Sequence, residues 1–206
     1  MHKVAELKQI LRLQGQEQWT GELLGLYDFP QKPPKIAETG ETFAENAQIK
    51  ANAVAHWLAL QNLPEDTFVL ADDSGLCVEA LNGAPGVRSA RYAGENATDH
   101  QNNQRLVAEL QARGITSSPA QYTCVLALQQ LKDRSQVSKI LFFEGQWNAE
   151  IRAECRGSQG FGYDLHMWIC AQGMWKTVAE LSFQEKCKHS HRAEAGKKLL
   201  QALVHL

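Results

Sequence analysis

The sequence predicts one globular unit, residues 1–206, that combines α-helices with β-strands. Apolar residues recur at helical spacing near both ends of the chain and in its first half. Short apolar runs that suit strands lie between these segments. The composition agrees, because 44% of the 206 residues are hydrophobic and 21% are charged, which is ordinary for a folded domain with a sizeable core.

Charge, hydropathy and cysteine content exclude several classes of function. The net charge of −2 gives no case for a nucleic-acid or acidic-membrane binder, so an anionic substrate would need a local patch of cations. No apolar run approaches the length of a membrane span, and the N-terminus lacks a signal-peptide core. The five cysteines form no Cys-x-x-Cys pair, so we expect reduced, mostly buried thiols in a cytoplasmic protein.

The first helix is predicted over residues 3–13, where apolar residues recur at helical spacing. Residues 15–41 are polar and carry three prolines. A strand in that segment would be short and near the edge of a sheet.

A second helix is predicted to begin after Thr42. Thr42 and Glu45 form a capping-box pattern. Asn46 and Lys50 stand four residues apart and therefore share one face of this helix. Its buried stripe is expected to consist of Phe43, Ala47, Val54 and Leu58.

The most distinctive stretch is Asp72-Asp73-Ser74-Gly75. A buried strand is predicted before it, over residues 67–71, and a second strand after it, over residues 76–81. The plainest interpretation is a polar turn, since Asp, Ser and Gly all favour turns. The alternative is a metal site, because adjacent carboxylates are costly to desolvate unless a cation shares the site.

A helix and a hairpin follow. Thr98 is the predicted N-cap of a helix over residues 99–113. Strands are predicted over residues 121–129 and 138–147, joined by a charged turn into an antiparallel hairpin. Gly145 is a candidate bulge in the second of these strands.

The segment from Arg156 to Asp164 is dense in glycine, which lets a backbone come close to a ligand. Phe161 would suit stacking on a flat base, and Asp164 would suit hydrogen bonding to it. The alternative is a tight turn with two core aromatic residues. The segment lacks the lysine of a phosphate-binding P-loop and the spacing of the dinucleotide fingerprint.

Lys186, Lys188 and Arg192, with two histidines, form the densest cationic cluster of the chain. Ser190 is a predicted N-cap for the C-terminal helix, so backbone N–H groups add to the positive field. Such a cluster would bind phosphate well, although a charge run of this kind also suits a solvated surface.

Several short motifs follow one another along the chain. They are ETGETFAENA at 38–47, ADDSGL at 71–76, LNGAPGV at 81–87, SARYAG at 89–94, GFGYD at 160–164, TVAEL at 177–181, Lys186 and SHR at 190–192. Each motif alone is modest evidence for a family, but all of them in this order are a specific pattern. With them, the chain resembles the inosine triphosphate pyrophosphatase family, whose members are also called dITP/XTP pyrophosphatases.

This resemblance implies an elongated α/β fold, with two lobes around a long mixed β-sheet and an active site in the central cleft. It also implies a homodimer. The activity it implies is Mg²⁺-dependent hydrolysis of ITP, dITP and XTP to the monophosphate and pyrophosphate, which removes deaminated purines from the nucleotide pool. That chemistry must neutralise a polyanion and activate a water, which carboxylates with Mg²⁺ and nearby cations can do.

Carried over by position, the resemblance makes Asp73 the catalytic general base and a metal-associated carboxylate. Asp72 and Glu38 correspond to further ligands of Mg²⁺. Histidine or arginine donors at the purine end would favour a 6-oxo group, because adenine's 6-amino group would leave them unpaired. The positions that the resemblance assigns to substrate binding are Lys3, Ser74, Phe161, Gly162, Tyr163, Asp164, Lys186, His191 and Arg192.

The sequence departs from the family's pattern at two places. Aligned on Lys3, the family's first strand and the Ser/Thr and Asn of its triphosphate loop would precede Met1. Leu165 stands where the family usually has proline, and residues 165–175 also differ. Two further hypotheses therefore stay open: a truncated nucleotide-binding form with weak or no turnover, and a related enzyme acting on modified pyrimidine or methylated nucleotides.

Overall fold

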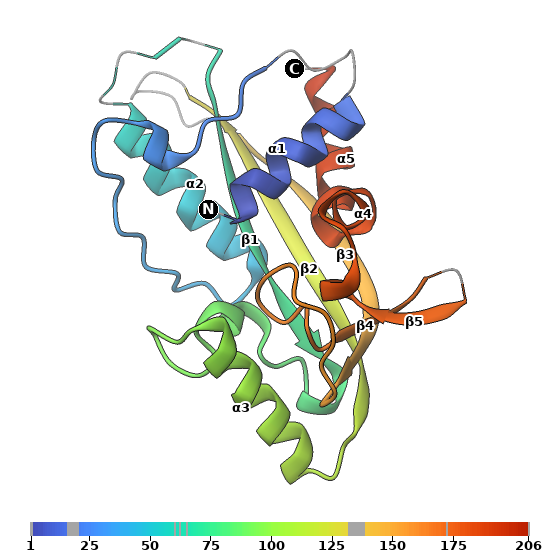
Figure 1. Cartoon of the computed structure of the whole chain (residues 1–206). Helices are drawn as coiled ribbons and strands as arrows, with labels where there is room; N and C mark the ends of the chain where they lie inside the picture. Colours follow the sequence, from blue (N-terminus) through green and yellow to red (C-terminus); the bar gives the residue numbers. More distant parts are fainter. Residues whose placement is uncertain are drawn as a thin grey trace.

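One five-stranded sheet organises the molecule, and its long strands run through most of the length of the fold (Figure 1). Of the 206 residues, the computed structural model describes residues 2–15, 21–59, 61, 63–64, 66–131, 139–171 and 173–205. The strands are β1 (Phe68–Val78), β2 (Ser117–Gln130), β3 (Ile140–Arg152), β4 (Met167–Ala171) and β5 (Met174–Thr177).

The strands lie in the order β1-β2-β3-β4-β5, so strands that are consecutive in the chain are neighbours in the sheet. Every neighbouring pair of these described strands is antiparallel. The elongated α/β fold is therefore confirmed, but the mixed sheet is not found among the described strands. Each strand reverses the direction of the one before it, whereas a parallel neighbour would need a crossover connection.

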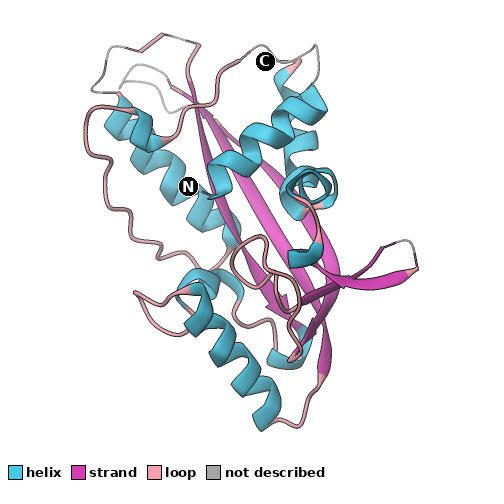
Figure 2. Ribbon diagram, in the orientation of Figure 1, coloured by secondary structure: helices cyan, strands magenta, loops and turns pink. Residues whose placement is uncertain are grey.

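Helices cover both faces of the sheet (Figure 2). α2 (Phe43–Leu58) packs on one face, and α1 (His2–Gly15) and α5 (His191–Leu203) pack on the other. α4 (Phe183–His189) lies beside α1 and α5. α3 (Asp99–Ala112) packs near the far end of the strands from these helices (Figure 1).

Both faces of the central strand β2 are buried. Its side chains are buried without a break from residue 122 to residue 128. Val125 and Ala127 join the core under α2, whereas Cys124, Leu126 and Leu128 join the core under α1 and α5. This alternation follows from the two-residue period of a strand, and it gives each face of the sheet its own set of helices.

The predicted helix starts are confirmed. The side chain of Thr42 accepts a hydrogen bond from the backbone N–H of Glu45, and the carboxylate of Glu45 accepts one from the backbone N–H of Thr42, so the capping box is complete. Thr98 and Ser190 cap α3 and α5 as expected. These caps satisfy backbone donors locally, which is why short-range sequence patterns predicted them.

The polar turn predicted at Asp72-Asp73-Ser74-Gly75 is wrong. These residues lie inside the continuous strand β1, where Asp73 is opposite Val125 and Ser74 is opposite Cys124 of β2. The second strand predicted over residues 76–81 is the end of β1, followed by a 3₁₀ turn at Glu79–Leu81. A full ladder with β2 satisfies the backbone, and this outweighs the local turn preference of the residues.

The bulge predicted at Gly145 is also wrong. Gly145 pairs in regular register with Cys124 on β2. A Cβ at this position would overlap the backbone oxygen of His191 and the backbone nitrogen of Ala195. The glycine therefore allows the first turns of α5 to lie directly on β3, a close approach that a side chain would prevent.

The remaining expectations have mixed outcomes. The hairpin of β2 and β3 is confirmed, and its predicted turn around residues 132–134 lies outside the described residues. Residues 21–41 contain a 3₁₀ turn at Leu26–Asp28 and no strand.

All five cysteines are free, but only Cys124 and Cys187 are buried, so the prediction that most of them are buried is wrong. No helix among the described residues has the length and apolar character needed to cross a membrane.

Candidate active site

Strand β1 presents its two aspartates to opposite faces of the sheet. Asp72 and Ser74 point toward α1 and α5, while Asp73 points toward α2. Adjacent residues of a strand alternate in this way. The site therefore has two polar clusters, one on each face of β1.

The first cluster surrounds Asp72, which lies between two cations. Lys3 Nζ is 2.8 Å from Asp72 Oδ1, and Arg192 Nε is 2.7 Å from Asp72 Oδ2. Both cations also donate to Ser74 Oγ, at 2.8 Å from Lys3 and 2.6 Å from Arg192. Arg192 Nη1 donates to the buried carboxylate of Glu6 at 2.7 Å. Helices α1 and α5 are thus joined to β1 through one buried arginine.

These cations fix the charge of Asp72. Burial alone would raise the pKa of this carboxyl, but Arg192 and Lys3 outweigh it and hold the pKa well below its usual range. Both carboxylate oxygens are engaged, one by Lys3 and Ser74 and the other by Arg192 and Cys124. In this arrangement Asp72 orients the two cations, and the structure does not bring it together with Asp73 and Glu38.

The second cluster surrounds Lys50 of α2. Its Nζ is 2.6 Å from Asp73 Oδ1, 2.9 Å from Glu38 Oε1 and 3.3 Å from the backbone oxygen of Asp72. Arg91 holds Glu38 from the other side, with 3.1 Å to Oε2 and 3.0 Å to the backbone oxygen. The structure therefore brings together Asp73 and Glu38, two of the three predicted metal ligands.

The two carboxylates of this cluster differ in their proton affinity. Burial raises the pKa of Asp73, and Lys50 only partly offsets it. At Glu38, burial acts in the same direction, but Lys50 and Arg91 together hold the pKa below its usual value. Asp73 Oδ2 is buried and has no hydrogen-bond partner among the described residues. A carboxylate with a raised pKa and a free oxygen suits a general base.

Magnesium fits this second cluster. It is usually held by one or two carboxylates plus substrate phosphates, and it keeps several waters. Asp73 and Glu38 supply two carboxylates, and Asp73 Oδ2 supplies an oxygen that the described protein leaves unpaired. The described residues contain no group of three or more His, Cys, Asp or Glu side chains placed to hold an ion.

A third group of residues surrounds Asp164, in the glycine-dense loop. Lys186 Nζ donates to Asp164 Oδ2 at 2.6 Å, and Tyr122 Oη donates to Oδ1 at 3.1 Å. The backbone N–H of Phe161 also donates to Oδ2, at 3.0 Å. Lys186 and Asp164 are both buried. The loop is therefore fastened to α4 and β2 through one carboxylate.

Aromatic rings complete this group. The ring of Phe161 stacks on His2 at 5.5 Å and has Lys186 Nζ 4.2 Å from its centroid. His191 stacks on Tyr122 at 4.8 Å. Burial, together with Arg192 and Lys186, holds the pKa of His191 well below its usual range, so the imidazole is neutral at pH 7. Its buried Nδ1 has no partner among the described residues.

Gly162 and Tyr163 shape the loop through backbone contacts. The N–H of Gly162 donates to Asp99 Oδ2 at 2.7 Å, and its carbonyl accepts from Asn103 Nδ2 at 2.7 Å. Tyr163 Oη donates to the backbone oxygen of Ser89 at 2.8 Å. Gly162 has φ +63°, which favours glycine. The first turn of α3 thus holds this loop in place.

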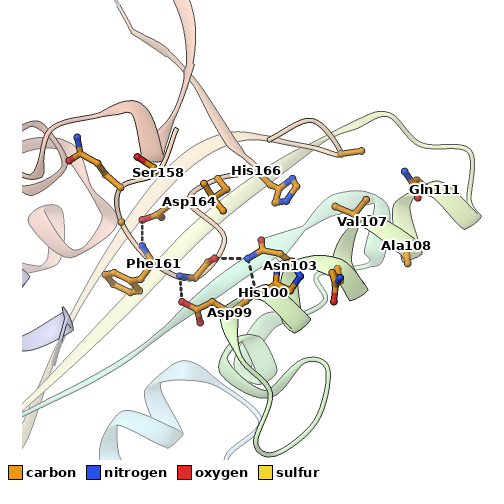
Figure 3. A pocket seen from close by; sticks show the side chains of 16 residues that line it. Asp99, His100, Asn103, Val107, Ala108, Gln111, Ser158, Phe161, Asp164 and His166 are labelled. Carbon is orange, nitrogen blue, oxygen red and sulfur yellow. Dashed lines mark hydrogen bonds between the residues drawn. The ribbon is translucent and has the colours of Figure 1, made fainter. Parts of the chain in front are cut away.

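One cavity of about 130 Å³ collects the predicted substrate-binding residues. All nine of them line it, from Lys3 and Ser74 at one end to the Phe161–Asp164 loop at the other. A larger cavity of about 500 Å³ lies behind the loop, against α3 (Figure 3). We place the candidate site at the smaller cavity, because the cations Lys3, Lys186 and Arg192 converge there.

Several residues of the site were not predicted. Lys50, Arg91, Glu6 and Tyr122 each bind a predicted residue directly. The sequence pointed in part to Lys50 as a site residue, because Lys50 shares a helix face with Asn46, close to the Glu38 segment. Nothing in the sequence pointed to Glu6 or Tyr122, because both lie in segments with the ordinary pattern of a helix or a strand.

Comparisons with known proteins show the family of the chain. The chain matches the Ham1 family over residues 1–202. It is 41% identical to the dITP/XTP pyrophosphatase of Nitrosomonas europaea, over 98% of this chain and 89% of that protein. It is 44% identical to the dITP/XTP pyrophosphatase of Chromobacterium violaceum, over 87% of this chain and 86% of that protein.

Solved structures give the same result. A Ham1 protein from Coxiella burnetii superposes with a TM-score of 0.79 at 38% identity, covering 99% of this chain and 94% of that one. A nucleoside-triphosphatase, or dITP/XTP pyrophosphatase, from Mycobacterium abscessus superposes with a TM-score of 0.65 at 34% identity. That match covers 98% of this chain and 94% of the other.

Proposed function

Because the chain belongs to the Ham1 family, we propose that it hydrolyses the non-canonical purine nucleoside triphosphates dITP, XTP and ITP to the monophosphate and pyrophosphate. Relatives that match most of the chain are named dITP/XTP pyrophosphatases. The observation that supports this best is one cavity in which three cations meet an aromatic, acid-bearing loop. A nucleotide needs both, since its phosphates are anionic and its base is flat.

In this proposal, Asp73 is the catalytic general base. Its raised pKa and unpaired Oδ2 support proton abstraction from a water near neutral pH. Lys3 is held in place by Asp72 and stabilises the negative charge that develops on the leaving pyrophosphate.

Asp73 and Glu38 would hold Mg²⁺ together with the phosphates of the substrate. When bound, the ion would neutralise phosphate charge and lower the pKa of a coordinated water. Asp72 was expected to share this role. Its opposite orientation and its two cation partners support a positioning role instead.

The base would stack on Phe161, with Lys186, His191 and Arg192 near its polar edge. Neutral His191 and cationic Arg192 are hydrogen-bond donors that a 6-oxo group satisfies. Adenine presents an amino group there, which leaves a buried donor unpaired and disfavours ATP.

The decisive experiment measures pyrophosphate release from dITP, XTP, ITP and ATP with Mg²⁺ and again with excess chelator. We expect release from the three non-canonical nucleotides, at least about 100-fold discrimination against ATP, and no release with chelator. Equal rates for ITP and ATP would contradict the proposed specificity. Calorimetric binding of ITP without hydrolysis would favour a nucleotide-binding form, and a preference for pyrimidine or methylated nucleotides would favour the related enzyme.

Two further proposals concern assembly and location. A homodimer is supported by the exposed apolar side chains of Met174 and Trp175, on the outermost described strand β5. Light scattering should give twice the chain mass of 23.0 kDa, and a monomer would refute it. A cytoplasmic location is supported by five unpaired cysteines, and fractionation of cells tests it.

A further inference from the structure

Lys50 occupies the position between the two carboxylates that suit a metal ion. Its ammonium lies 2.6 Å from Asp73 Oδ1 and 2.9 Å from Glu38 Oε1. The backbone oxygen of Asp72 is a third neighbour, at 3.3 Å. Three oxygens, two of them from carboxylates, therefore surround one protein cation. This is the ligand chemistry that Mg²⁺ and Mn²⁺ prefer.

A metal ion and this ammonium would compete for the same oxygens. Asp73 Oδ1 accepts a hydrogen bond from Lys50 and Glu38 Oε1 forms an ion pair with it, so a bound divalent ion would need the same atoms or would lie beside a like charge. Glu38 and Asp73 are already balanced by Lys50 and Arg91. In the nucleotide-free protein these four side chains therefore carry no net charge, and Glu95, which also contacts Arg91, is exposed to solvent.

Lys50 is the cation of this cluster that is able to move. Arg91 holds Glu38 by a carboxylate oxygen and by the backbone oxygen, which is a two-point contact. Lys50 ends in a single charged group on a flexible four-carbon stem, and its side chain is 18% exposed. A polyphosphate carries several negative charges, and lysine is a common phosphate ligand that acts as a point charge.

We propose that Lys50 holds the metal position until a nucleotide phosphate draws its ammonium away, so that the metal ion enters with the nucleotide and not before it. This inference rests on the proposed nucleotide-binding function. It gives Lys50 two successive partners: the carboxylates of Asp73 and Glu38 first, and the substrate phosphates afterwards. Asp73 is then free of its ion pair with Lys50 only when substrate is present. It can therefore act as a general base only when a nucleotide is bound.

The experiment measures Mn²⁺ binding by electron paramagnetic resonance, without nucleotide, for the wild type and for Lys50→Met. We expect at least about ten-fold tighter binding to Lys50→Met, because Asp73 then lacks its cation while Arg91 still pairs with Glu38, so a net negative charge replaces a neutral cluster. Lys198→Met is the matched control, since Lys198 forms an exposed ion pair with Glu194 away from the site, and it should bind Mn²⁺ like the wild type. Circular dichroism checks folding, and Lys50→Gln serves as a second variant.

Two further measurements locate the effect. The double variant Lys50→Met with Asp73→Asn should lose the gain, because it removes the carboxylate that Lys50 neutralises. With a non-hydrolysable imido analogue of ITP, the wild type should bind Mn²⁺ at least about ten-fold tighter than it does alone. Equal Mn²⁺ affinity of nucleotide-free wild type and Lys50→Met, or a gain that survives Asp73→Asn, would overturn the proposal. Pyrophosphate release by the wild type is measured separately. A failure of the proposed hydrolysis can therefore be told apart from a failure of the Lys50 proposal.

Discussion

Asp72 and Asp73 are neighbours on β1, yet Asp72 lies 2.7 Å from Arg192 on one face of the sheet and Asp73 lies 2.6 Å from Lys50 on the other. Their environments shift their pKa values in opposite directions, downward for Asp72 and upward for Asp73. A pair that reads as one acidic motif therefore consists of a permanent anion and a proton acceptor.

Replacing Asp73 by Asn should reduce pyrophosphate release from dITP by about 10²–10⁴-fold, because a general base contributes on that scale. In the wild type, the rate should fall as the pH falls through the raised pKa of Asp73, at a higher pH than an ordinary Asp, near 3.9, would give. The exposed Asp66 provides a control, since Asp66→Asn should keep the full rate. A wild-type rate in Asp73→Asn would remove Asp73 from the mechanism.

The same substitution should stabilise the fold. Because the folded-state pKa of Asp73 is raised, its ionised form destabilises the protein above that pKa, and the penalty disappears as the pH falls through it. Asp73→Asn should therefore raise the free energy of unfolding by about 0.5–2 kcal/mol at pH 7, and the gain should shrink in acid. Denaturant titration at several pH values measures this, and a loss of stability at pH 7 would contradict it.

Asp72→Asn should have the opposite effect and lower the free energy of unfolding by about 3–5 kcal/mol at pH 7, because it leaves Arg192 buried and only partly paired. The folded-state pKa of Asp72 is depressed, so its contribution is present above the unfolded value near 3.9 and lost as the pH falls through the folded value. The difference between variant and wild type should stay constant from pH 7 to about pH 5. A variant as stable as the wild type would show that Arg192 does not depend on this partner.

Tyr122→Phe should raise the KM for dITP with little change in kcat. The variant keeps the ring that stacks on His191 but removes the hydroxyl that donates to Asp164. Loss of one such bond is worth about 0.5–1.5 kcal/mol, or roughly 2- to 13-fold in KM. Tyr92→Phe is the matched control, because Tyr92 is equally buried and donates to Glu109, outside the cavity. Identical kinetic effects of the two variants would refute a specific role for Tyr122.

Gly145→Ala should destabilise the protein by about 1–3 kcal/mol or more, because the new methyl group overlaps the backbone of α5 at His191 and Ala195. The displacement would also move Arg192, so the KM for dITP should rise. Gly25→Ala is the control, since its added methyl would make only ordinary contacts at 3.5 Å and beyond. Thermal unfolding of both variants tests this, and an unchanged midpoint for Gly145→Ala would show that α5 does not need the close approach.

The sequence by itself determined the features that depend on nearby residues. The N-caps at Thr42 and Thr98, the helical stripes and the β2–β3 hairpin are local, because their hydrogen bonds and apolar periods join residues close along the chain. The ordered motifs, through the family resemblance, also led to the predicted substrate-binding set, and all nine members line one cavity. Those positions could be named from sequence because the resemblance carries each of them over within a short motif of this chain.

Only the tertiary structure decided which way the aspartates face and which cations they meet. Asp72-Asp73-Ser74-Gly75 has the composition of a turn, and it is a strand because β2, about fifty residues away, pairs with it along its whole length. That pairing sends Asp72 to Lys3 and Arg192 and sends Asp73 to Lys50. Local propensity cannot report such partners, since the ladder and the ion pairs join segments that are distant in the chain and meet only when the sheet and its helices pack.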